Sequence, residues 1–185
     1  MSRLPPATRD SVPEQQREIF DEIILGLNTV PVNGPGSIMI HVPEASKRAS
    51  ALNQYLRQDS SLSKKIQELA MLVTAREMDC QYVWNAHAAS AKAAGLDPEI
   101  VEALREEKEL PDLAPAEQAV VNYGQEFYRN HHVSSGGFQA ALEQFGKQGV
   151  VELTMLMGNY ALLAFLVNAF DSGLPSERTE AILPV

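Results

Sequence analysis

The feature that most constrains the fold is a nearly unbroken apolar segment close to the end of the chain, from Val150 to Phe170. Its length and composition would suit a helix that crosses a bilayer. Glu152, Asn159 and Asn168 interrupt it, however, and polar groups are costly in hydrocarbon. We therefore predict a buried core helix and no membrane partner. A helix that is apolar on nearly all sides must be covered on more than one of them. The segment therefore also predicts that the chain packs against copies of itself.

The rest of the chain shows helical periodicity with recognisable start and stop signals. Apolar residues recur at three- and four-residue intervals, and proline, glycine and capping residues separate the periodic segments. We predict helices over residues 13–28, 37 or 43 to 57, 63–77, 79–94, from 98 onward, 115–127 and 135–145, with a loop over 30–36 and a break at Gly146 or Gly149 before the last helix. No segment alternates with the period of two that is typical of strands. The predicted fold class is all-α.

Length, charge and cysteine content limit the kind of protein further. The 185 residues fit one domain, with an N-terminal arm over 1–12, a helical domain over 13–175 and a tail over 176–185. The net charge of -9 argues against nucleic acid or an anionic membrane surface as a partner. Cys80 is alone, so no intrachain disulfide can form, and the N-terminus lacks a signal-peptide pattern. We expect a cytoplasmic protein.

One constellation of side chains can carry chemistry. Cys80, Val83, Trp84 and His87 stand at i, i+3, i+4 and i+7, which places them on one face of a helix. Glu68 lies twelve residues before Cys80, on the preceding helix. A short turn between the two helices would fold them back to back. We therefore expect the Glu68 carboxylate to approach the His87 imidazole.

These residues also belong to a longer pattern. It comprises Glu68-Leu69-Ala70, the run from Cys80 to His87, Ala93-Ala94-Gly95-Leu96, Phe145-Gly146, Val151-Glu152-Leu153 and Gly158-Asn159-Tyr160. The pattern resembles the carboxymuconolactone decarboxylase and alkylhydroperoxidase D superfamily over roughly residues 38–175. The resemblance implies a single-domain helical bundle of the alkylhydroperoxidase D-like type. It also implies assembly of the chain into homo-oligomers, either trimers or hexamers.

The peroxidase branch of this superfamily uses a Cys-x-x-Cys motif, in which the second cysteine attacks peroxide and the first forms the disulfide. By resemblance, Cys80 matches the first cysteine, Glu68 the acid and His87 the histidine. Val83 occupies the position of the peroxide-attacking cysteine. Since valine forms neither a thiolate nor a disulfide, a two-cysteine cycle within one subunit is excluded.

The chemistry left to Glu68 and His87 resembles that of the decarboxylase branch better. The substrate of that branch is an anionic unsaturated lactone that loses carbon dioxide. The resemblance implies that His87 donates to the lactone oxygen while Glu68 orients the histidine or relays its proton. We expect burial beside Leu72 and Trp84 to raise the pKa of Glu68. The predicted function is that of a lyase or isomerase that needs no cofactor. It would act on a small unsaturated carboxylic acid or lactone, as in the catabolism of aromatic compounds.

Four further residues are candidates for substrate binding. Trp84 can form an apolar wall beside Val83, His41 follows a proline-glycine loop, and Tyr160 lies on the apolar last helix, where polar groups can line a cavity. No metal site is predicted. The adjacent pair His131-His132 lies near a helix end, where imidazoles can meet free carbonyl groups.

Two other interpretations of the site stay open. Cys80 could act as a one-cysteine thiol peroxidase with an external thiol as its resolving partner. Alternatively, the chain could be a catalytically silent member of the fold, with Cys80 as a small buried hydrophobe, His87 as a structural histidine and Glu68 as a residue that complements a helix dipole. The joint spacing of these residues, rather than any single one, favours the catalytic interpretation.

Overall fold

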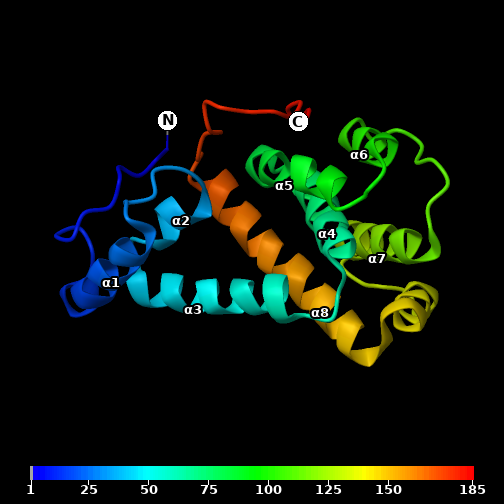
Figure 1. Ribbon diagram of the computed structural model, residues 1–185, viewed down its shortest axis with the longest axis horizontal. Coiled ribbons are helices and arrows are strands. Elements are labelled where there is room, and N and C mark those ends of the chain that lie inside the picture. The colour runs from blue at the N-terminus through cyan, green and yellow to red at the C-terminus, as the bar shows by residue number, and fades with distance from the viewer. Residues whose placement is uncertain (1) are drawn as a thin grey trace.

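The computed structural model describes residues 2–185, which form helices joined by loops and contain no strand (Figure 1). The predicted all-α class is therefore confirmed for the described residues. In chain order the α-helices are α1 (Arg17–Leu27), α2 (Gly34–Met39), α3 (Pro43–Gln54), α4 (Lys64–Glu77), α5 (Gln81–Ala93), α6 (Pro98–Arg105), α7 (Pro115–Asn130) and α8 (Ser135–Ala169). A short 3-10 turn, η1 (Glu14–Gln16), precedes α1, and a π-helical turn, η2 (Tyr55–Asp59), follows α3.

Helix α4 is the centre of the fold. Every residue from Ile66 to Arg76 is buried, and the helix packs against α5, α7 and α8. It begins where the sequence predicts, because the Ser63 hydroxyl accepts a hydrogen bond from the backbone N–H of Ile66. A helix covered on all sides holds its polar residues inside the protein. This placement brings Glu68 into the core.

Helix α8 contains the apolar segment predicted to form a core helix. Gly146, with φ 66° and ψ -179°, breaks it where the glycine signal predicts a separation. Helix α8 is long and apolar enough to cross a membrane by length and composition, and 56% of its most apolar window is buried inside the protein. The part after the break crosses behind the other helices and packs on α4 and α7 (Figure 1). This packing agrees with the predicted core helix.

The region between α1 and α3 differs from the prediction of a loop over 30–36. Helix α2 already begins at Gly34, since Pro35 occupies the first helical turn, where a backbone N–H is not needed. The Gly34 N–H is instead donated to the Ser172 hydroxyl at 2.8 Å. The predicted start at Pro43 is confirmed for α3, but regular α-helix ends at Gln54 and a π-helical turn takes the chain past Arg57.

The tail predicted over 176–185 lies against its own chain and crosses the end of α5 (Figure 1). Leu183 is fully buried. The Gln81 side chain donates to the Leu183 carbonyl at 2.9 Å, and Arg76 donates to the Pro184 carbonyl at 2.8 Å. The tail thus covers the end of the helix pair that holds the candidate site.

Candidate active site

The centre of the site is a contact between one carboxylate and one imidazole. Glu68 on α4 is fully buried, and its Oε2 lies 2.8 Å from Nδ1 of His87 on α5. Helices α4 and α5 reverse direction at Asp79, which adopts a left-handed conformation with φ 48°. The structure therefore brings the two side chains together as the spacing predicts.

Two cations approach the other oxygen of the same carboxylate. Lys64 Nζ lies 2.9 Å and Arg57 Nη2 lies 3.2 Å from Glu68 Oε1. Arg57 Nη1 also donates to the Tyr160 hydroxyl at 3.4 Å. The Tyr160 ring meets the His87 ring edge to face, with centroids 5.1 Å apart. Residues from η2, α4, α5 and α8 thus converge on one carboxylate.

The pKa of Glu68 is lowered, which corrects the expectation that burial raises it. Burial does act upward on this pKa, as predicted. The hydrogen bonds and positive charges of His87 and Lys64 act downward, and together they outweigh burial. Glu68 is consequently ionised at neutral pH. It can orient His87 and stabilise a protonated imidazole, but it has no proton to give.

His87 keeps one ring nitrogen available. Its Nδ1 faces Glu68, whereas Nε2 forms no hydrogen bond within residues 2–185 and is not fully enclosed. Because an ionised carboxylate only accepts hydrogen bonds, we assign the hydrogen to Nδ1. Nε2 is then a base when the ring is neutral and a proton donor when the ring is charged. This is the arrangement that general acid–base chemistry requires.

A polar pocket of about 410 Å³ lies next to this cluster. It is lined by Ser50, Asn53, Gln54, Arg57, Gln58 and Lys64. Its volume lies in the range of small-molecule sites. Both cations that contact Glu68 form part of its wall, so the pocket offers positive charge and hydrogen-bonding groups to a ligand. Such a lining suits a small anion.

The comparison with family models supports the resemblance. Residues 43–126 match the model of the carboxymuconolactone decarboxylase family, and this segment contains Glu68, Cys80 and His87. Through this segment the chain is similar to the carboxymuconolactone decarboxylase family over somewhat less than half of its length. None of the curated proteins matches the chain.

Solved structures extend the likeness to nearly the whole chain. The alkylhydroperoxidase AhpD core of an uncharacterized peroxidase-related protein from Ralstonia eutropha has a TM-score of 0.73 at 19% identity, covering 95% of this chain and 93% of that one. A peroxidase-related protein from a Silicibacter species has a TM-score of 0.70 at 17% identity, covering 95% and 92%. A debrominase in complex with 2,3,4-tribromopyrrole has a TM-score of 0.70 at 16% identity, covering 95% of each chain. At these identities the likeness shows the AhpD-like fold alone.

Cys80, a hallmark of the carboxymuconolactone decarboxylase resemblance, lies just before α5 and is fully buried. Burial raises the pKa of its thiol, although the backbone N–H groups of Tyr82 and Val83 partly oppose that effect. The thiol is therefore protonated at neutral pH. Val83 and Trp84 are 3% and 1% exposed and pack in the hydrophobic core. A substrate contact for either side chain stays a prediction.

The other two residues predicted to bind substrate, Tyr160 and His41, lie in different parts of the structure. Tyr160 joins the cluster around Glu68, whereas His41 lies in the turn between α2 and α3 and forms no hydrogen bond with Glu68 or His87. The Nε2 atom of His41 is buried without a hydrogen-bond partner within residues 2–185. In the same part of the chain, no three His, Cys, Asp or Glu side chains gather as a metal-binding group.

Arg57 and Lys64 are the site residues that the sequence interpretation missed. Lys64 could have been found, because a lysine four residues before a glutamate contacts it on a helix. Arg57 carries no such signal. Its position depends on the π-helical turn η2, in which Leu56 is fully buried and Arg57 faces Glu68. Such turns are frequent at functional sites of helical proteins.

Proposed function

We propose that this chain is a general acid–base enzyme that needs no cofactor, a lyase or isomerase of a small unsaturated carboxylic acid or lactone. The observation that carries the proposal is the 2.8 Å contact between Glu68 and His87 beside two cations on a pocket wall. The family match supports chemistry of the decarboxylase kind. The polar pocket supports an anionic substrate.

In the proposed mechanism, Arg57 and Lys64 bind the substrate carboxylate in the pocket that they line. As the carboxylate leaves as carbon dioxide, the electrons of the broken carbon–carbon bond pass into the conjugated system as an enolate. His87 in its charged form gives the Nε2 proton to that enolate at carbon. Glu68 stays ionised throughout and stabilises the imidazolium through Nδ1.

The substrate-binding part of this proposal is tested by Arg57→Gln. Loss of one charge-assisted hydrogen bond is expected to raise KM about 10- to 100-fold while kcat changes less. Steady-state kinetics on a panel of small unsaturated carboxylic acids and lactones would measure both. Arg48→Gln is the matched control, because Arg48 lies on α3, pairs with Glu44 and does not line the pocket. An unchanged KM in the Arg57 variant would exclude its role in binding.

A second candidate function is thiol chemistry at Cys80, which the peroxidase-related neighbours favour. Two observations weigh against it. The thiol is fully buried with a raised pKa, and Val83 replaces the second cysteine. A one-cysteine peroxidase needs an accessible thiolate. The acid–base proposal therefore ranks first.

We also propose that the chain assembles with copies of itself through α8. Its exposed side carries an apolar stripe at alternating four- and three-residue spacing, made of Val151, Met155, Gly158, Leu162 and Phe165. This is the spacing by which one helix packs against another of the same kind, and Gly158 leaves room for close approach at its middle. Light scattering is expected to show trimers or hexamers, and Leu162→Lys with Phe165→Glu to show smaller species. A monomeric parent protein would contradict this.

A further inference from the structure

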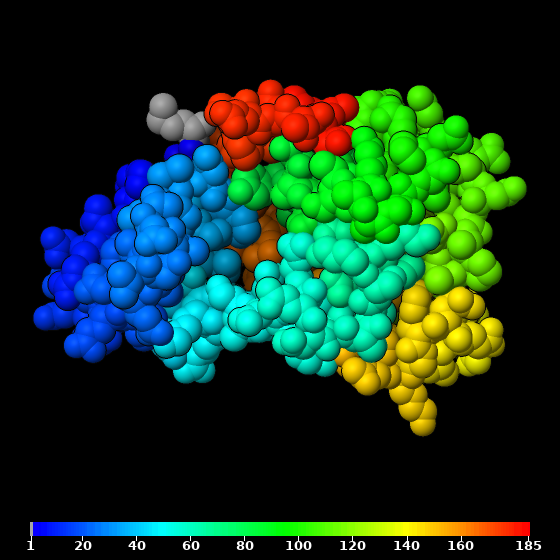
Figure 2. Space-filling model, viewed as in Figure 1, coloured from blue at the N-terminus to red at the C-terminus, as the bar shows by residue number. Residues whose placement is uncertain are grey.

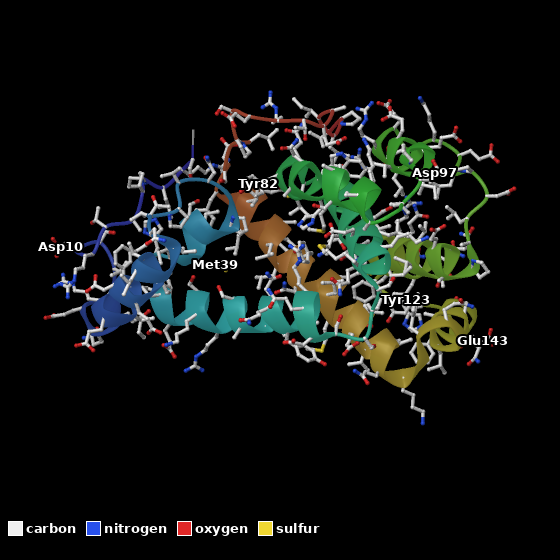
Figure 3. All side chains as sticks on the ribbon, viewed as in Figure 1. Asp10, Met39, Tyr82, Asp97, Tyr123 and Glu143 are labelled. Carbon is white, nitrogen blue, oxygen red and sulfur yellow. The ribbon has the colours of Figure 1, made fainter. Side chains whose placement is uncertain are left out.

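A second, apolar cavity lies alongside α3. It has a volume of about 620 Å³ and lies between α1, α2 and α3. Its apolar lining includes Ile23, Leu27, Pro31, Met39, Ile40 and Ala51. Figure 3 labels Met39 at the end of α2, and Figure 2 shows α1 and α2, in blue, lying together beside the start of α3 at one side of the molecule. Neither the family match nor the Glu68–His87 chemistry accounts for this cavity.

The apolar cavity adjoins the polar pocket. Ser50 and Gln54 line both of them, and they stand one helical turn apart on α3. A ligand held by Arg57 and Lys64 in the polar pocket therefore meets the apolar cavity as soon as it extends past Gln54. The two lie in sequence along one helix, with Arg57 and Lys64 at one end and the Lys47–Glu22 ion pair at the other.

We infer that the two cavities form one cleft and that its ligand is an amphipathic monocarboxylate. The carboxylate binds Arg57 and Lys64, and an apolar chain or ring system lies between α1, α2 and α3. This inference rests on the proposed function, because it assigns the same pocket to the substrate carboxylate. From Gln54 to Lys47 the cleft follows α3 for roughly 10 Å, which sets the length of the apolar part.

The rim of the apolar cavity favours a small molecule over a second protein chain. Lys47 and Glu22 both line the cavity and form an ion pair at 2.9 Å, so the far end carries paired charges instead of an apolar surface. The apolar stripe on α8 supplies a separate surface for a second copy. A concave apolar space with a few polar groups at one end is the usual form of a small-molecule site.

The experiment is a calorimetric titration of the full-length protein with linear saturated monocarboxylates from butanoate to octanoate. Burial of each added methylene is expected to lower Kd about fourfold. The corresponding primary alcohols are expected to bind more weakly at every length, since they lack the charge. A Kd that is independent of chain length would overturn the inference.

Variants that fill the cavity sharpen the test. Ala51→Leu and Gly26→Leu are expected to weaken octanoate at least tenfold and to leave butanoate unchanged; a Cβ added at Gly26 meets nothing within 4 Å. Ala45→Leu is the control, because Ala45 is exposed on the same helix outside the cavity. The inference would also be overturned if both filling variants bound octanoate as tightly as the parent protein. A change of their oligomeric state, instead of a change in octanoate affinity, would overturn it as well.

The same data separate this inference from the proposed function. Binding that depends on Arg57 but not on chain length would reject the apolar subsite and keep the carboxylate site. A second outcome is an affinity that increases with the chain length of the carboxylate, in a protein whose turnover is unchanged by substitution of Glu68 or His87. That outcome would keep the cleft and reject the acid–base chemistry. The affinity measurement needs no turnover, so the test of the apolar subsite does not depend on knowing the physiological substrate.

Discussion

Replacing Glu68 by glutamine is expected to lower kcat by about 100- to 10,000-fold, the usual contribution of a positioned acid–base pair. An amide neither compensates a charged imidazole nor holds the His87 tautomer that leaves Nε2 as the acid–base atom. His87→Gln is expected to cause a loss of similar size. The double variant should lose little more, because the two residues act as one unit. Steady-state kinetics on the lactone and carboxylic acid panel would measure all three.

Two controls show whether this loss is specific. Glu117→Gln alters another buried glutamate that pairs with a lysine, Lys65, away from the site, and kcat should be nearly unchanged. Cys80→Ser should also retain most of the activity, and the parent protein should form no sulfenic acid on exposure to peroxide. If Cys80→Ser abolishes turnover while Glu68→Gln does not, thiol chemistry replaces the acid–base proposal. Circular dichroism would verify that each variant is folded.

Much of the fold was predictable because its signals are local. The Ser63 cap, the Asp97-Pro98 start of α6 and the breaks at Gly95 and Gly146 depend only on neighbouring residues, and the structure contains each of them. The contact between Glu68 and His87 was predictable for a related reason. Two adjacent helices joined by a short turn must pack against each other, so a residue's position along each helix determines which side chains meet.

The features that were not predictable depend on parts of the chain far apart in sequence. Arg57 reaches Glu68 only because a π-helical turn follows α3, and periodicity does not indicate such a turn. The direction of the Glu68 pKa shift was predicted wrongly for a different reason. The contacts of Glu68 with His87 and Lys64 follow from local spacing, but whether they outweigh burial depends on their distances in the fold.

The same distant contacts make Glu152 a strong determinant of stability. This glutamate on α8 is 2% exposed, and its carboxylate accepts hydrogen bonds from the Tyr55 hydroxyl at 2.8 Å, from the Ser61 N–H at 2.8 Å, from the Ser61 hydroxyl at 2.6 Å and from the Gln148 amide at 2.9 Å. Burial acts to raise its pKa, yet the hydrogen bonds lower it to about 2. The carboxylate thereby ties η2, which carries Arg57, to α8.

Replacing Glu152 by glutamine is expected to lower the free energy of unfolding at pH 7 by about 2 to 3 kcal/mol, because the change of its pKa from 4.5 to about 2 corresponds to about 3 kcal/mol. Since the folded state holds the ionised form, this contribution is complete above pH 4.5 and is lost as the pH falls towards 2. Urea unfolding at pH 7 and pH 3 would measure it. Glu143→Gln, at an exposed position labelled in Figure 3, should change little. An equal effect of Glu152→Gln at both pH values would show that packing, and not the ionised carboxylate, holds η2 on α8.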